Sequence, residues 1–155
     1  MLPINQTLGI DQCNCFAMRK AARQISRFYD AHLQSSGLRI TQFLTLAALN
    51  ELGSAAVSAL AERLDVERTA MGKMVDFLQR DGLVTIRPSP TDGRSRLIEL
   101  TVNGGLLYKK AAPLWRKAQR EFKRLNGARR VTALRQGLAE MTVGDVATDY
   151  QSLLS

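Results

Sequence analysis

The stretch VSALAERLDVERTAMGKMVDFLQRDGLVTIRPSPTDGRSRLIELT, residues 57–101, decides the fold. Its first half repeats apolar side chains at the spacing i, i+3, i+4 and i+7, which marks the buried face of a helix. These side chains are Val57, Leu60, Ala61 and Leu64 in a first run and Met71, Met74, Val75 and Leu78 in a second run. Residues 65–67 between the runs leave room only for a tight turn. The sequence therefore predicts two short helices that cross at a steep angle.

Two β-rich runs follow the second helix. Gly82 is placed to end that helix, and the runs are residues 83–86 (LVTI) and 97–100 (LIEL). Between them, residues 87–96 read RPSPTDGRSR, in which two prolines and an Asp-Gly pair favour turns. The sequence thus predicts a hairpin with a cationic tip directly after the helix pair. This order of elements is typical of a winged helix-turn-helix.

Such a unit suits duplex DNA. Recognition of a duplex needs a helix that fits the major groove, and cations placed against phosphates or the minor groove. The groups available for this are Arg68, Thr69, Gly72 and Lys73 on the second helix and Arg87, Arg94 and Arg96 in the hairpin. Double-stranded DNA is the expected partner. The alternative is that these residues form an ordinary solvated helix face and a soluble turn.

This stretch resembles the MarR-type transcriptional regulators. The matching segments are LAERL at 60–64, RT at 68–69, MVDFL at 74–78, DGLV at 81–84, DGRS at 92–95 and LT at 100–101. The resemblance implies that the second helix enters the major groove, that Arg94 reaches into the minor groove, and that Asp92 braces the loop through a charged hydrogen bond. At two positions the chain departs from the family pattern: Ala70 stands where threonine is common, and Gly93 stands where arginine is common. The DNA sequence that this protein recognises therefore cannot be inferred from the family.

Composition agrees with a polyanionic partner. The 155 residues contain 22 Lys and Arg against 14 Asp and Glu, a formal net charge of +8, which favours nucleic acid over a membrane. No apolar run approaches the roughly 20 residues that cross a bilayer. The first seven residues lack the pattern of a secretory signal. We therefore expect a cytoplasmic protein with no membrane partner.

Apolar stripes also predict helices outside this stretch. The stripe residues are Cys15, Met18, Ala22, Ile25, Tyr29 and Leu33 in a first helix, Leu107, Ala111, Leu114, Ala118, Phe122 and Leu125 in a long helix after Thr101, and Val131, Leu134, Leu138 and Met141 in a last helix at about 128–141. Thr41 is the expected N-cap of a helix that ends at Leu52 before Gly53. Pro113 is expected to bend the long helix or to disturb its hydrogen bonding locally.

The predicted fold is mainly α with a small β-hairpin wing: a winged helix-turn-helix with N- and C-terminal dimerisation helices. We divide it into residues 1–36, which contribute to dimerisation, residues 37–101, which bind DNA, and residues 102–155, which complete the dimer, within one structural domain. A single winged helix cannot cover the terminal stripes, so we expect a homodimer on a pseudo-palindromic operator. The alternative is an intramolecular bundle.

Cys13 and Cys15 stand near the start of the first helix. A structural disulfide is not expected, because residues two apart on a helix point to different sides. A metal site is not expected either, since the chain has one histidine and no second cysteine pair. A helix N-terminus favours the thiolate, which is the form that peroxides attack. The alternative is that Cys15 is a small buried residue of the helix interface.

The segment Cys15-Phe16-Ala17, together with Tyr29, resembles the organic-hydroperoxide-sensing branch of the MarR regulators. That resemblance implies oxidation of Cys15 and a hydrogen bond to it from the tyrosine that matches Tyr29. Further tyrosines of that branch are replaced here by Arg19 and Ile40. Cys13, from the same chain or a partner chain, could resolve an oxidised Cys15.

The expected function is that of a sequence-specific DNA-binding transcriptional regulator, in the simplest case a repressor. A small aromatic ligand, or oxidation by a peroxide, would release it from its operator, and Phe16, Phe43 and Trp115 could line the ligand pocket. No cofactor and no catalytic residue is expected, because the sequence has no glycine-rich phosphate loop and no nucleophile elbow. The alternative function is a winged-helix protein-protein adaptor that does not bind DNA.

Overall fold

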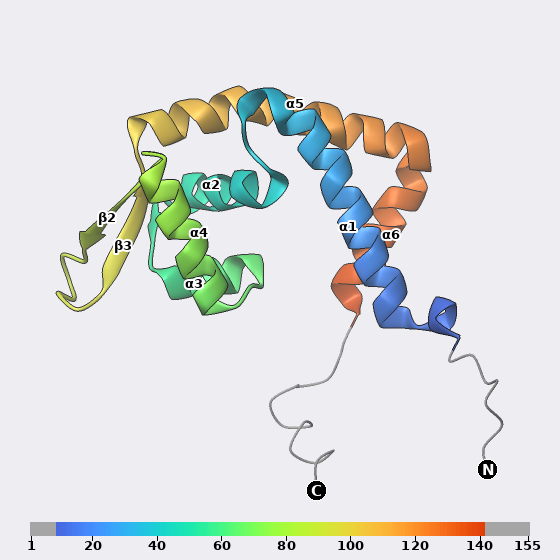
Figure 1. Cartoon of the computed structure of the whole chain (residues 1–155), viewed down its shortest axis with the longest axis horizontal. Coiled ribbons are helices and arrows are strands. Elements are labelled where there is room, and N and C mark those ends of the chain that lie inside the picture. Colours follow the sequence, from blue (N-terminus) through green and yellow to red (C-terminus); the bar gives the residue numbers. More distant parts are fainter. Residues whose placement is uncertain (1–8, 142–155) are drawn as a thin grey trace, which may run out of the picture. The chain divides into compact units, whose positions relative to one another are not determined.

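The computed structural model describes residues 9–141 and divides the chain into two units, Met1–Ala118 and Gln119–Ser155. Its elements are the short 3-10 helices η1 (Ile10–Gln12) and η2 (Gln34–Ser36), the helices α1 (Asn14–Leu33), α2 (Ile40–Leu52), α3 (Val57–Leu64), α4 (Arg68–Arg80), α5 (Val102–Asn126) and α6 (Ala128–Glu140), and the strands β1 (Ser54–Ala55), β2 (Val84–Pro88) and β3 (Arg96–Leu100) (Figure 1). The predicted fold class, mainly α with a hairpin wing, is confirmed. The expectations for the first seven residues and for the tail after Thr142 lie outside the described residues.

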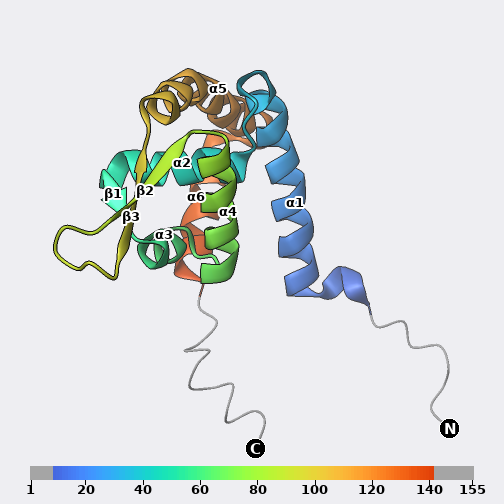
Figure 2. The ribbon, with the colours of Figure 1, turned by 60° about the vertical axis from the view of Figure 1, so that its left-hand side comes forward.

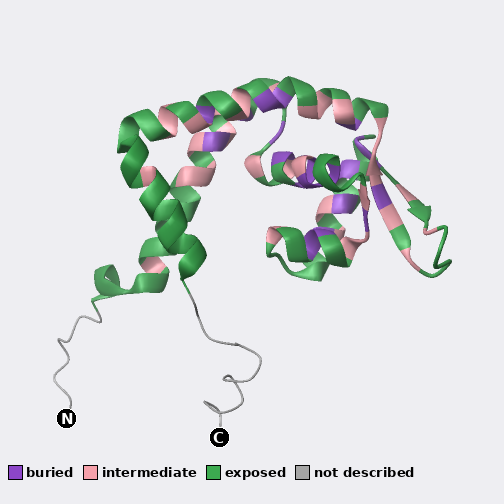
Figure 3. Cartoon of the chain, turned by 180° about the vertical axis from the view of Figure 1, so that it is seen from behind, coloured by how far each residue is buried: buried purple, intermediate pink, exposed green. Residues whose placement is uncertain are grey.

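The core of the first unit lies between α2, α3, α4 and a three-stranded antiparallel sheet of order β1-β3-β2. Ile98, on the central strand, is fully buried and pairs with Ile86 on one side and Ala55 on the other. Figure 3 shows buried residues on these elements, and further ones on α1 and α5. The sequence pattern missed β1, because two residues are too few to show an alternation of buried and exposed side chains.

The turn between α3 and α4 is as short as predicted. Asp65 takes the left-handed conformation, with φ of 51°, which aspartate tolerates better than most residues. The amide of Asp65 donates to the carbonyl of Glu62 at 3.2 Å, and the amide of Val66 donates to the carbonyl of Ala61 at 2.9 Å. These two bonds close the end of α3 and send the chain directly into α4.

The end of α4, the end of the wing and the start of α5 meet at Thr101. Gly82, at φ of 70°, ends α4 as predicted. The Thr101 hydroxyl donates to the Gly82 carbonyl at 2.6 Å and accepts from the Gly104 amide at 3.0 Å, so it also caps α5. The Thr101 amide donates to the carbonyl of Leu83 at 3.1 Å. Three elements are therefore fixed to one another by a single residue.

The prediction that Thr41 caps α2 is wrong, because the helix begins at Ile40 with Arg39 as its N-cap, two residues earlier than predicted. The acceptors at its first turn come from elsewhere: Asp30 Oδ1 accepts from the Ile40 amide at 2.7 Å, and Gln42 Oε1 accepts from the Arg39 amide at 2.9 Å. Thr41 lies inside the helix. A cap supplied by α1 is a tertiary contact, which the local sequence pattern does not contain.

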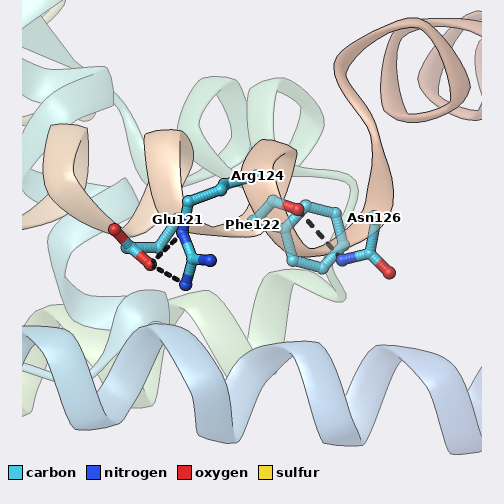
Figure 4. A network of polar contacts seen from close by, with 4 residues as sticks. All are labelled: Glu121, Phe122, Arg124 and Asn126. Atoms are coloured by element: carbon cyan, nitrogen blue, oxygen red, sulfur yellow. Dashed lines mark hydrogen bonds and ion pairs between the residues drawn. The ribbon is translucent and has the colours of Figure 1, made fainter.

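The long helix α5 runs through Pro113 without a break. In the second unit, its last turns carry a small polar network (Figure 4). The Arg124 guanidinium donates to Glu121 Oε2 at 2.8 and 3.0 Å, and the Asn126 side-chain amide donates to the Phe122 carbonyl at 3.0 Å. The last predicted helix is present as α6, and it buries no residue within the chain.

Among residues 9–141, no helix combines the length and the apolar character that spanning a membrane requires.

Among the described glycines, Gly104 has the least room for a side chain. A Cβ built there would lie 1.9 Å from the carbonyl oxygen of Leu83, whereas a Cβ at the neighbouring Gly105 would meet no atom within 4 Å. We predict that Gly104→Ala lowers the free energy of unfolding by about 2 kcal/mol or more, because the backbone of the wing root must move. Gly105→Ala is the matched control and should raise the free energy of unfolding by up to about 1 kcal/mol. Urea denaturation of both variants measures this, and equal effects would contradict it.

Candidate nucleic-acid interface

Helix α4 turns one face inward and the opposite face to solvent. Met71, Val75 and Leu78 are buried, whereas Arg68, Thr69 and Lys73 are exposed, as the spacing predicts. Gly72 is half-buried, and a Cβ there would meet nothing within 4 Å. In Figure 2 this helix stands beside α3, and the hairpin of β2 and β3 projects next to the pair. The exposed face is therefore free to approach a surface closely at Gly72.

The tip of the wing is held by hydrogen bonds rather than by apolar packing. The amide of Ser89 donates to the carbonyl of Ser95 at 2.7 Å across the base of the tip. The Asp92 carboxylate accepts from the backbone amide of Arg94 at 3.1 Å and from the Ser95 hydroxyl at 2.9 Å. These two bonds, that to Arg94 first, hold the pKa of Asp92 below its ordinary value. Asp92 thus keeps the loop folded in its charged form and fixes the backbone that carries Arg94.

The three wing arginines differ in their surroundings. Arg87 forms an ion pair with Glu99 on the neighbouring strand. Arg94 and Arg96 are exposed and have no ion pair with any described residue. In the sequence, the family resemblance distinguished Arg94 from the other two arginines, but the pairing of Arg87 was missed, although Glu99 lies across the predicted hairpin and could have revealed it. Arg94 and Arg96 keep their full charge available to a partner, and Arg87 shares its charge with a carboxylate.

Three predicted site residues come together in space. Arg68 from the start of α4, together with Arg94 and Arg96 from the wing, lines one hollow of about 310 Å³. Ser58 and Ser95 line the same hollow, and the sequence analysis missed both. No local pattern marks these serines, because the hollow forms only when α3, α4 and the wing pack together.

The two cysteines are exposed and free. Cys13 is the N-cap residue of α1 with an extended backbone, and Cys15 is the second helical residue, so only Cys15 is truly on the helix. Within residues 9–141, no group of His, Cys, Asp and Glu side chains could hold a metal ion. The thiol of Cys15 is therefore open to solvent in the single chain.

Tyr29 lies on the same helix as Cys15 but is buried, and burial raises its pKa. The two residues are separated by fourteen positions, which is about 21 Å along a helix. A hydrogen bond between Cys15 and Tyr29 of one chain is excluded by this distance. The pair that the resemblance implies can form only between two copies.

The three aromatic residues expected to line a ligand pocket are not gathered within the chain. Phe43 stacks on Trp115, with ring centroids 5.9 Å apart, and on Tyr108 at 5.7 Å. Phe16 lies in the first turn of α1, where the ammonium of Lys20 is 5.9 Å from its ring centroid. The structure thus brings together two of the three residues: Phe43 lies in the core, and Trp115 is partly buried against it.

A second hollow, of about 330 Å³, lies beside α4. It is lined mainly by apolar side chains of α2, α3 and α4: Thr41, Leu44, Thr45, Leu64, Val66, Ala70, Met71 and Met74. Its volume falls in the range that small organic ligands occupy. Met71, Met74 and Leu64 were predicted only as core residues. Helical periodicity marks a buried face, but it does not show whether that face is fully packed or lines a cavity.

Known proteins resemble this chain in sequence and in fold. Residues 38–95 match the model of the MarR family. The organic hydroperoxide resistance transcriptional regulator of Bacillus subtilis (strain 168) is 30% identical over 100 residues, which are 64% of this chain and 68% of that relative. Among solved structures, the M. tuberculosis transcriptional regulator MosR in complex with DNA is 40% identical with a TM-score of 0.70, covering 83% of this chain and 97% of that one. A mutant MarR from E. coli complexed with operator DNA, 20% identical with a TM-score of 0.79, covers 88% and 98% and supports the fold. The chain therefore belongs to the MarR family, and the named relatives are transcriptional regulators rather than enzymes, as the sequence predicts.

Proposed function

We propose that this protein is a homodimeric transcriptional repressor that binds duplex DNA through α4 and the wing. The observation that carries the proposal is the fixed arrangement of two exposed cationic elements on one core: α4 with Arg68 and Lys73, and the wing with Arg94 and Arg96. The junction at Thr101 ties the wing to the end of α4. The solved complexes of MosR and MarR with DNA support this assignment.

In this proposal the two elements read different parts of the duplex. The exposed face of α4 enters the major groove, where Arg68, Thr69 and Lys73 reach base edges or phosphates and Gly72 permits close approach. Arg94 enters the minor groove, whose potential attracts arginine, and Asp92 holds the loop that presents it. Arg87 adds a weaker charge, because Glu99 neutralises part of it.

Exposed apolar stripes support a homodimer. Of the stripe predicted on α1, only Tyr29 and Leu33 are buried within the chain, and Met18 is 41% exposed. Leu134 and Leu138 on α6, and Met141 directly after it, are each about half exposed. Apolar side chains in such rows are stabilised by burial, at roughly 1.5–3 kcal/mol for each large one. We propose that the first and last helices of two copies cover these rows and display two copies of α4 to a pseudo-palindromic operator.

We predict that Leu134→Glu combined with Leu138→Glu converts the dimer to a monomer, because two carboxylates would have to be buried at the interface. Light scattering coupled to size-exclusion chromatography measures the mass. Arg129→Glu is the control: it makes the same change in net charge on an exposed residue of the same helix. A wild-type protein that runs as a monomer at micromolar concentration would contradict the dimer.

For DNA binding, we predict that Lys73→Ala combined with Arg94→Ala weakens binding on the order of a hundredfold, because two charge-assisted contacts are lost. The slope of log affinity against log salt should fall by about two. Fluorescence anisotropy on a duplex selected from a random pool gives both values. Lys109→Ala combined with Arg116→Ala removes equal charge from exposed positions of α5 and should have little effect.

If the Lys73 and Arg94 double variant binds DNA as tightly as the wild type at physiological ionic strength, the proposed interface is wrong. Capture of a protein partner that does not respond to salt, without any capture of DNA, would favour the winged-helix adaptor instead.

We propose oxidation of Cys15 as the signal that releases DNA. The Cys15 thiolate would attack the peroxide oxygen, the O–O bond would break, an alcohol would leave after protonation, and a sulfenic acid would remain on Cys15. Attack by a Cys13 thiolate on that sulfur would then give a disulfide and water. The exposure of both thiols and the likeness to a regulator of organic hydroperoxide resistance support this signal. The tyrosine that forms a hydrogen bond with the oxidised Cys15 would be Tyr29 of a second copy and not Tyr29 of the same chain.

A small ligand is the other candidate signal, and the apolar hollow between α2 and α4 is the observation that favours it. Either signal would act by favouring one separation of the two α4 helices over another, which changes the affinity for DNA.

We predict that cumene hydroperoxide changes the mass of the wild type by the loss of two hydrogens, as the Cys13–Cys15 disulfide forms, and abolishes its DNA binding, and that Cys15→Ser binds DNA equally well before and after treatment. Intact-mass spectrometry and anisotropy on the same samples measure both. Cys13→Ser is the matched control and should lose DNA binding through a stable sulfenic acid. Equal release of DNA from Cys15→Ser and the wild type would remove Cys15 as the sensor and leave the ligand.

A further inference from the structure

The hollow between the starts of α3 and α4 and residues 94–96 of the wing has the composition of an oxyanion site. Its lining consists of Ala56, Val57 and Ser58 at the start of α3, Arg68 at the start of α4, and residues 94–96 of the wing. Three arginines and two serines line this space of about 310 Å³, and no acidic residue lines it. Arg68, Arg94 and Arg96 form no ion pair with any residue in the described range 9–141. Three like charges in one hollow repel each other, and an anion would relieve this repulsion.

The start of α3 adds donors to the same place. Ala56 occupies the N-cap position, and no side chain accepts the amides of the first turn. Amides at a helix start favour negative charge, and Val57 and Ser58 belong to that turn. Arginine binds phosphate oxygens in a two-pronged manner that lysine does not reproduce. The guanidinium groups, the serine hydroxyls and these amides are the donors that a phosphate accepts.

We infer that this hollow seats one backbone phosphate of the bound DNA in each half-site. The inference rests on the proposed function and adds a specific contact to it. Arg68 reaches the hollow from α4 and Arg94 and Arg96 reach it from the wing, so the DNA strand that separates the major groove from the adjacent minor groove passes between them. The phosphate on that strand is the anion placed to enter.

This placement divides the cationic residues by role. Arg96, Ser58 and Ser95 hold the phosphate and set the register of the protein on the duplex, and they carry no sequence information. Lys73 and Thr69, which do not line the hollow, remain available to base edges. Arg87, paired with Glu99, takes no part.

The test uses the full-length protein and a duplex selected from a random pool, in which one phosphate at a time is replaced by a neutral methylphosphonate. For the wild type, one position per half-site should weaken binding on the order of tenfold beyond its neighbours. In Arg96→Gln that position should lose its extra sensitivity, because the two changes remove the same contact. Arg116→Gln, at an exposed position of α5, is the charge-matched control and should keep the full profile of the wild type.

Identical profiles for the wild type and Arg96→Gln would overturn the inference while leaving DNA binding intact. Failure of the wild type to bind any duplex would instead overturn the proposed function. A final arm adds inorganic phosphate without DNA at constant ionic strength and follows the amides of Ser58 and Ser95 by NMR. Saturation at micromolar phosphate would identify a free oxyanion as the ligand and overturn the assignment to the DNA backbone. Weak, unsaturated shifts at millimolar phosphate would support it.

Discussion

The position of the wing depends on the hydroxyl of Thr101. It donates to the carbonyl that ends α4 and accepts from an amide in the first turn of α5, and the Thr101 amide holds the carbonyl of Leu83. Gly104 is part of the same constraint, since only a residue without a Cβ fits against that carbonyl. Arg68 and Arg94 are far apart in sequence, yet they line one hollow because this junction fixes the wing against the helix pair. The cationic surface is therefore a property of the packed core and not of the loop alone.

Much of the helix-turn-helix could be predicted from local signals. The bounds of α3 and α4 follow from apolar spacing, from a turn too short for anything else, and from Gly82. The features that were missed depend on contacts between distant residues. The strand β1 exists because two residues pair with β3, and the start of α2 is set by Asp30 rather than by Thr41. Neither contact can be predicted from the apolar spacing or the capping residues of the local sequence.

The candidate site divides in the same way. Residue type and helical phase identify Arg68, Lys73 and Arg94, because an exposed cation beside a recognition helix is visible in the sequence. Their convergence with Ser58 and Ser95 is not visible, since it requires three elements in their final arrangement. Phe16 shows the opposite error: its residue type suits a pocket with Phe43, but the two aromatic residues lie in different surroundings.

The left-handed Asp65 in the turn between α3 and α4 has a consequence for how the protein can respond to any signal. A glycine hinge would let α4 swing about its own start, but an aspartate in this conformation, fixed by two backbone bonds, allows little rotation. A movement of α4 must therefore be a movement of the whole winged helix-turn-helix, with the bending at its ends rather than inside it. An effector would tilt the whole unit as a rigid body and leave the fit of each half to its own groove unchanged.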